Sequence, residues 1–186
     1  MLIMKLYELC PQIEKNESYI YFDKKYLSDI FDFFLMDMDT NIVKKEIPAL
    51  AQPGLTDNLL SNQDALDAII NVPIFSENFV KKVGTIMSKD VTFYPCLINS
   101  KYRYYLGKIK TKCQLIDYDI SEYWDISDDD DRDAEPILSS PVYLSNTSES
   151  FYIARDIKED TEFLVSELFK DLIIKHKFNI KIREVS

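Results

Sequence analysis

The stretch Phe163-Leu164-Val165-Ser166-Glu167-Leu168-Phe169, which continues to Val185, decides how the chain is expected to fold. Its apolar run reaches Ser166, whose hydroxyl is well placed to accept a hydrogen bond from a free N–H in the first turn of a helix. Glu167 follows where the helix dipole favours an anion. Apolar residues then recur every three or four positions, which predicts a helix over 167–176, and the alternation after Asn179 predicts a closing strand.

The same pattern occurs earlier, at Ile74-Phe75-Ser76-Glu77-Asn78-Phe79, and predicts a second helix over 77–87 and a strand at 91–94. A serine nucleophile would need an activating base, and neither serine lies in a glycine-flanked elbow. The chain therefore should contain two similar strand-cap-helix-strand units. We interpret four residues as their structural helix caps: Ser76, Glu77, Ser166 and Glu167.

The whole pattern predicts an α+β fold with a mixed, mainly antiparallel sheet and a few helices. The chain has 186 residues, of which 46% are hydrophobic, and this fits a single domain over 1–186. Strands are expected at 2–9 and 18–22, followed by a helix at 24–38 with one apolar face. Weaker patterns suggest a short strand at 41–47 and short helices near 57–60 and 63–70.

Charge and composition exclude several classes of function. The net charge is −10 and the pI about 4.6, and no lysine and arginine cluster provides the basic face of a general nucleic-acid binder. The three glycines lie far apart, so phosphate-binding loops are absent and we expect no cofactor. Cys10, Cys96 and Cys113 match neither a disulfide framework nor a zinc site, which indicates reduced thiols in the cytoplasm. The N-terminus is typical of a strand, and no apolar run approaches about 18 residues, so we expect no membrane contact.

The most basic stretch alternates positive charge with tyrosine between residues 101 and 112. A nucleic-acid patch has this composition, but so does a half-exposed strand, and we favour the strand. We therefore expect no nucleic-acid partner. The residues concerned are Lys101, Tyr102, Arg103, Tyr104, Tyr105, Lys108, Lys110 and Lys112.

Residues 121–135 are the most polar stretch, and they include the only tryptophan, Trp124. A calcium loop would need a glycine at its bend, and none is present. A solvated acidic loop is one interpretation. The other is a partner-binding site, because an aromatic anchor beside negative charge suits a protein interface. We assign the predicted partner-binding site to Tyr123, Trp124, Asp128, Asp129, Asp130 and Asp131.

The order of these segments resembles the immunity protein 11 family of bacterial polymorphic toxin systems. Besides the two Ser-Glu helices, the resemblance rests on Phe93-Tyr94-Pro95, on the sheet segment 102–119, on the polar stretch and on the closing segment 151–185. It covers about residues 55–186, which we take as the core, and it leaves 1–54 as an N-terminal lobe. A glycine usual before the last strand is replaced by Phe178-Asn179, and asparagine tolerates the left-handed conformation expected there.

The resemblance implies a cytoplasmic immunity protein that binds and neutralises a cognate toxin domain, without catalytic residues or a metal. A net charge of −10 would speed the capture of a basic toxin. One alternative is an adaptor or interaction module of a secretion system, which would have a different partner. Another is a hydrolase that uses two of the 32 acidic residues, and a cleft with carboxylates of perturbed pKa would favour it.

Overall fold

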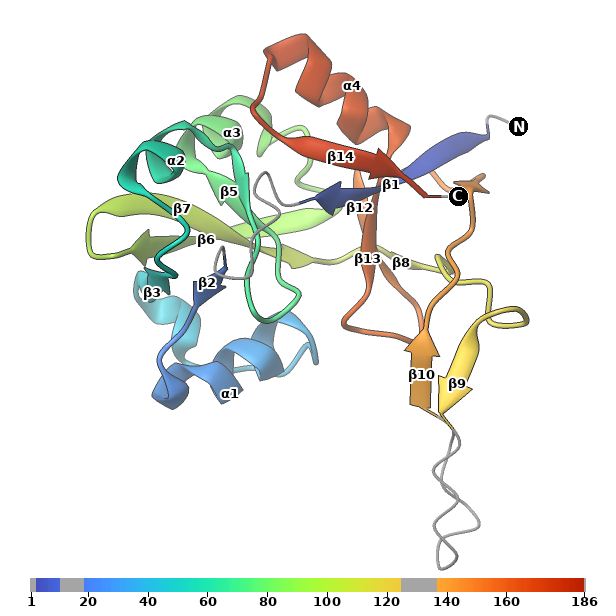
Figure 1. Cartoon of the computed structure of the whole chain (residues 1–186), viewed down its shortest axis with the longest axis horizontal. Coiled ribbons are helices and arrows are strands. Elements are labelled where there is room, and N and C mark those ends of the chain that lie inside the picture. The colour runs from blue at the N-terminus through green and yellow to red at the C-terminus, as the bar shows by residue number, and fades with distance from the viewer. Residues whose placement is uncertain (1–2, 11–18, 125–136, 186) are drawn as a thin grey trace, which may run out of the picture.

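The computed structural model describes residues 3–10, 19–124 and 137–185, which form two β-sheets, four α-helices and a separate two-stranded hairpin (Figure 1). The predicted α+β class with mixed, mainly antiparallel pairing is confirmed. The helices are α1 (Lys24–Phe34), α2 (Asp57–Asn62), α3 (Glu77–Val83) and α4 (Glu167–His176), with a 3-10 helix η1 (Ile42–Lys44). The strands are β1 (Met4–Cys10), β2 (Ile20–Tyr21), β3 (Ile47–Ala51), β4 (Ala65–Leu66), β5 (Ile74–Ser76), β6 (Val91–Ile98), β7 (Tyr102–Ile109), β8 (Lys112–Cys113), β9 (Glu122–Trp124), β10 (Ile137–Ser140), β11 (Asn146–Thr147), β12 (Ile153–Asp156), β13 (Phe163–Ser166) and β14 (Lys181–Glu184).

The first sheet has the strand order β2-β3-β6-β7-β5-β4 and closes into a small barrel. All of its neighbouring strands are antiparallel except β3 and β6. A parallel bridge between Ile20 and Ala68 closes it, since Ile20 N donates to Asp67 O at 2.8 Å and Ile69 N donates to Ile20 O at 3.0 Å. Closure pairs backbone groups that would otherwise lie on the open edges of the sheet.

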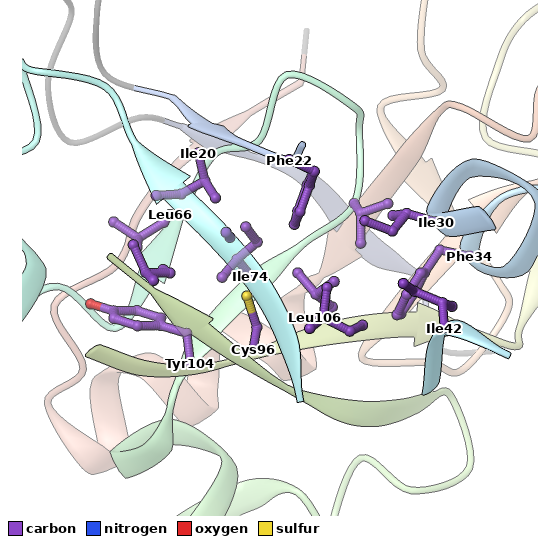
Figure 2. Packing of buried hydrophobic residues seen from close by; sticks show 14 of the residues in the cluster. Ile20, Phe22, Ile30, Phe34, Ile42, Leu66, Ile74, Cys96, Tyr104 and Leu106 are labelled. Carbon is purple, nitrogen blue, oxygen red and sulfur yellow. The ribbon is translucent and has the colours of Figure 1, made fainter. Parts of the chain in front are cut away.

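Buried apolar side chains fill the barrel (Figure 2). Ile74, Cys96 and Leu106 come from its strands and are fully buried, and Ile30 and Phe34 of α1 pack into the same cluster. Burying a side chain of this size contributes roughly 1.5–3 kcal/mol. Helix α1 is therefore part of the barrel's core.

The second sheet has the order β11-β1-β13-β12-β8, and β14 also pairs with β1. The sequence predicts that residues 1–54 form an N-terminal lobe, but the structure divides the described part of this segment between the two sheets. β1 pairs with β13 and β14 near the end of the chain, whereas β2, α1 and β3 belong to the barrel. The difference arises because pairing between strands about 160 residues apart leaves no local sequence signal.

The two strand-cap-helix-strand units, β5-α3-β6 and β13-α4-β14, meet where the two sheets join. Phe79 and Phe169 occupy the same position, three residues after each capping serine, and their ring centroids lie 5.7 Å apart. Phe79 also stacks on Phe75 at 4.4 Å and contacts Phe178 at 4.8 Å. We call these four residues, together with Phe93, the phenylalanine cluster. It belongs to one hydrophobic core with side chains from both sheets.

Each unit begins its helix with a serine cap. Ser76 Oγ accepts a hydrogen bond from Phe79 N at 3.0 Å, and Ser166 Oγ accepts one from Leu168 N at 3.2 Å. The glutamate after each serine lies in the first helical turn, where it complements the helix dipole. The hydroxyl of the buried Ser166 also donates to the Phe151 carbonyl, so it joins α4 to the segment before β12.

Helix lengths agree with the sequence predictions in part. α4 has the predicted bounds, but α1 ends at Phe34 instead of residue 38 and α3 ends at Val83 instead of residue 87. Beyond the C-cap Leu35 the chain turns back, since Asp37 adopts a left-handed conformation with φ of 54° and Met38 N donates to Asp32 O at 2.9 Å. After α3 the chain continues in turns to residue 90.

Two of the weaker sequence patterns predict the wrong element. Residues 42–44 form the 3-10 helix η1, and the strand begins later, at Ile47. Residues 65–66 form β4 instead of a helix, because Ala65 and Leu66 pair with β5. The predicted short helix after Thr56 is present as α2, and the Thr56 hydroxyl accepts from Leu59 N.

Asp64 connects the two units through hydrogen bonds. Its buried carboxylate accepts from Ser76 Oγ at 2.5 Å, from Asn78 Nδ2 at 3.1 Å and from Asn179 N at 2.9 Å. The left-handed residue expected at Asn179 is instead Lys177, the C-cap of α4, with φ of 56°. Asn179 therefore serves as a hydrogen-bond partner of the first unit.

We predict that Asp64→Ala lowers the free energy of unfolding by about 3 kcal/mol, because three donors would lose a buried charged acceptor. Chemical denaturation of the wild type and the variant measures the difference. The control is Asp57→Ala, which removes an exposed carboxylate paired with Lys101 and should leave the free energy of unfolding nearly unchanged. Equal losses in the two variants would contradict the connecting role of Asp64.

Candidate functional site

The hairpin of β9 and β10 pairs with no other described strand and stands out from both sheets (Figure 1). The sequence predicts a loop around Trp124, but the structure places Trp124 at the end of β9. It lies opposite Ile137 of β10, and cross-strand partners project on the same face of a sheet. Trp124 is 68% exposed and Ile137 is 52% exposed. Large apolar side chains exposed side by side mark a candidate protein-binding site.

The base of the hairpin is the segment 115–118, which leads into β9, and it is held by the buried carboxylate of Asp156 in β12. Its Oδ2 accepts from the backbone nitrogens of Leu115 at 2.8 Å and Ile116 at 3.1 Å. Its Oδ1 accepts from Lys158 N at 2.8 Å and from the Tyr118 hydroxyl. Burial would raise the pKa of Asp156, but these hydrogen bonds outweigh it and hold the pKa below the ordinary value. The hairpin is thereby fixed to the second sheet by an ionised group.

Two further side chains brace the hairpin. The hydroxyl of Tyr123, a partly exposed residue of β9, donates to Tyr118 O at 3.2 Å. The Ser121 hydroxyl donates to Asp117 O at 2.6 Å and accepts from Val142 N at 2.9 Å. These bonds link the segment before β9 to the segment after β10. An exposed Trp124 is therefore presented on a supported strand.

The structure covers the predicted partner-binding site only in part. Tyr123 and Trp124 are adjacent on β9, and Ile120, in the turn before β9, is also exposed. Sequence reasoning missed Ile120, an isolated apolar residue in a polar stretch, and it missed Ile137, which only strand pairing identifies. The other four predicted residues lie outside the described part of the chain: Asp128, Asp129, Asp130 and Asp131.

The hydrolase alternative needs a cleft lined by two carboxylates, and a pocket of about 620 Å³ beside β1 and β14 is lined by Glu8 and Glu162. Both of its carboxylates already have partners, since Glu8 pairs with Arg183 at 2.5 Å and Glu162 accepts from the Tyr143 hydroxyl at 2.5 Å. Catalysis by two carboxylates needs one protonated and one ionised group on either side of a bond to be cleaved. The engaged carboxylates of this pocket give that alternative no support.

The basic stretch lies mainly on β7, an interior strand of the barrel. Tyr104 is buried and its hydroxyl donates to Leu60 O at 2.8 Å. Four basic side chains of this stretch are paired with carboxylates, which favours a half-exposed strand over a phosphate-binding patch. The ion pairs are Lys101 with Asp57 at 2.8 Å, Arg103 with Glu46 at 3.0 Å, Lys108 with Asp37 at 3.6 Å and Lys112 with Asp160 at 2.8 Å.

The described residues contain no group of three or more histidine, cysteine, aspartate or glutamate side chains arranged to hold a metal ion. The cysteines Cys10, Cys96 and Cys113 are free. Burial raises the pKa of the Cys96 and Cys113 thiols to about 12, so both are protonated near neutral pH. In the same part of the chain, every helix is too short or too polar to cross a membrane.

No protein-family model matches the chain, and no curated protein is similar to it. The resemblance to the immunity protein 11 family therefore rests on the order and spacing of its motifs.

The exposure of Trp124 predicts a fluorescence signal, because it is the only tryptophan in the chain. Acrylamide should quench the folded protein nearly as strongly as the urea-unfolded chain, and the emission maximum should shift little on unfolding. A blue-shifted emission that resists quenching would contradict the exposed position on β9.

A second prediction concerns Asp67, which lines a pocket of about 230 Å³ with Leu9, Asn71 and Phe163. Burial raises the pKa of Asp67 to about 6. A carboxyl with a higher pKa in the folded state stabilises the fold below about pH 4, and this contribution is lost as the pH rises through 6. Relative to the wild type, Asp67→Asn should therefore gain about 2 kcal/mol of unfolding free energy between pH 4 and pH 7.

Denaturation at a series of pH values measures this gain. The control is Asp29→Asn, which changes an exposed carboxylate. A difference between Asp67→Asn and the wild type that does not vary with pH would show that Asp67 is not held in a desolvated site.

Proposed function

We propose that this protein is an immunity protein, which binds a toxin domain in the bacterial cytoplasm and blocks it by forming a stable complex. The exposed Trp124 on a braced hairpin carries the proposal. Tryptophan is among the residue types most enriched in binding hot spots. A hairpin already fixed at its base loses little conformational entropy when a partner covers it. The toxin as partner comes from the family resemblance.

Charge supports a basic partner. The net charge of the chain is −10, and the sequence places Asp128 to Asp131 between the two strands of the hairpin. Opposite charge on a partner raises the rate of association, and salt reduces this effect. The binding of such a toxin should therefore slow as the ionic strength rises.

The mechanism that fits these features is stoichiometric inhibition. The complex covers the toxin's active site or holds it in an inactive shape, and no residue of this chain takes part in bond cleavage. An interface of ordinary size buries about 1,600 Å² in total, with a few aromatic anchors at its centre. Trp124 is the anchor we assign to this protein.

We expect a neighbouring gene to encode a large protein that ends in a toxin domain, and the test uses that domain. We expect this domain to arrest the growth of a test bacterium when expressed alone, and we expect co-expression of this protein to restore growth. The two purified proteins should elute together from a sizing column. Trp124→Ala should weaken protection, whereas Ile174→Ala, which truncates an exposed residue of α4, should retain it.

Two results would contradict the proposal. One is a domain that stays toxic when this protein is co-expressed at high level. The other is separate elution of the two proteins at micromolar concentration, where a complex of useful affinity would remain associated.

A further inference from the structure

The exposed pair on the hairpin is too small to form a whole interface. A stable complex covers about 800 Å² of each partner, several times the area that Trp124 and Ile137 present. The partner must therefore contact another surface. A second group of large exposed apolar side chains lies at the end of α1, and we call Phe31, Met36 and Met38 the methionine patch. Met36 is 46% exposed and Met38 is 55% exposed.

The methionine patch is presented by an ordered turn. Met36 N donates to Phe31 O at 3.3 Å and Met38 N donates to Asp32 O at 2.9 Å, so the chain folds back against α1. Asp37, between the two methionines, has a left-handed conformation with φ of 54°. Strained conformations persist where their surroundings hold them, and here the Asp37 carboxylate lies 3.1 Å from Lys112 Nζ.

A series of contacts joins this turn to the hairpin. Lys112, which pairs with Asp37, also pairs with Asp160 at 2.8 Å in the turn between β12 and β13. In the same turn, Lys158 lies over the Tyr118 ring, 4.5 Å from its centroid. The Tyr118 carbonyl in turn accepts from the hydroxyl of Tyr123 on β9. Figure 1 shows α1 and the hairpin extending to the same side of the molecule.

The intervening turn continues the apolar character of this surface, because Ile157 is exposed. The charged groups of the connected segments, residues 35–40, 115–124 and 157–161, are mainly acidic. These segments carry seven carboxylates and one lysine, and Lys108 of β7 and Lys112 of β8 add two positive charges, which leaves a net charge of −4. The carboxylates are Asp37, Asp39, Asp117, Asp119, Glu122, Glu159 and Asp160, and the lysine is Lys158.

We infer that the methionine patch is the second contact for the same basic toxin domain that binds Trp124. This inference rests on the proposed function. The acidic groups between the two apolar areas suit a partner whose apolar contacts are separated by lysine and arginine. Methionine side chains are flexible and polarisable, so they adapt to a partner's surface, while the tryptophan supplies a rigid anchor.

The test measures binding kinetics with the purified toxin domain that we expect a neighbouring gene to encode. Met36→Ser with Met38→Ser should raise the dissociation rate about tenfold or more, the loss expected when hot-spot contacts are removed. Ile86→Ser with Ile174→Ser is the matched control, because these residues are 45% and 63% exposed beyond α3 and on α4. The control should change the rate less than about twofold, a change of only a few tenths of a kcal/mol. Unchanged melting temperatures establish that both variants fold.

The outcomes separate this inference from the function on which it rests. If Trp124→Ala weakens binding but the methionine variant does not, the methionine patch is not a contact, and the proposed function stands. If the wild-type protein does not bind the domain at all, the proposed function fails as well. If sedimentation shows a dimer of this chain that the methionine variant dissociates, the patch binds a second copy and the inference is wrong.

Discussion

Phe79 lies where the two halves of the fold meet, because its ring contacts those of Phe75, Phe169 and Phe178. The first of these belongs to the barrel and the other two to the closing unit, so one buried ring is shared by both sheets. Removing a large aromatic side chain from such a core costs about 3–5 kcal/mol, a large part of the stability of a typical domain. The relative position of the sheets, and hence of every surface feature, depends on this packing.

Buried carboxylates reinforce the same junction. Asp64 connects the cap of α3 with the segment between α4 and β14. Asp90 accepts from Tyr152 N at 2.7 Å, which connects the segment before β6 with the segment before β12. Asp156 holds the base of the hairpin. These groups have their hydrogen bonds within the fold, which gives them a structural role, whereas the function we propose relies on exposed apolar side chains.

Local sequence patterns predict the units of this fold but not their assembly. Both serine caps and the bounds of α4 follow from the spacing of apolar residues around Ser76 and Ser166. The barrel closure at Ile20 and the pairing of β1 with β13 depend on distant partners, so periodicity within one segment does not reveal them. The candidate site shows the same limit, since composition singles out Trp124 and only pairing across the hairpin adds Ile137.

The most direct measurement of the binding face is hydrogen–deuterium exchange of this protein, free and in complex with the toxin domain that we expect a neighbouring gene to encode. We expect slower exchange in the complex over residues 120–124 and 137–140, with unchanged exchange over α4. Slower exchange confined to β1 and β14, around the pocket lined by Glu8 and Tyr143, would contradict a binding face on the hairpin.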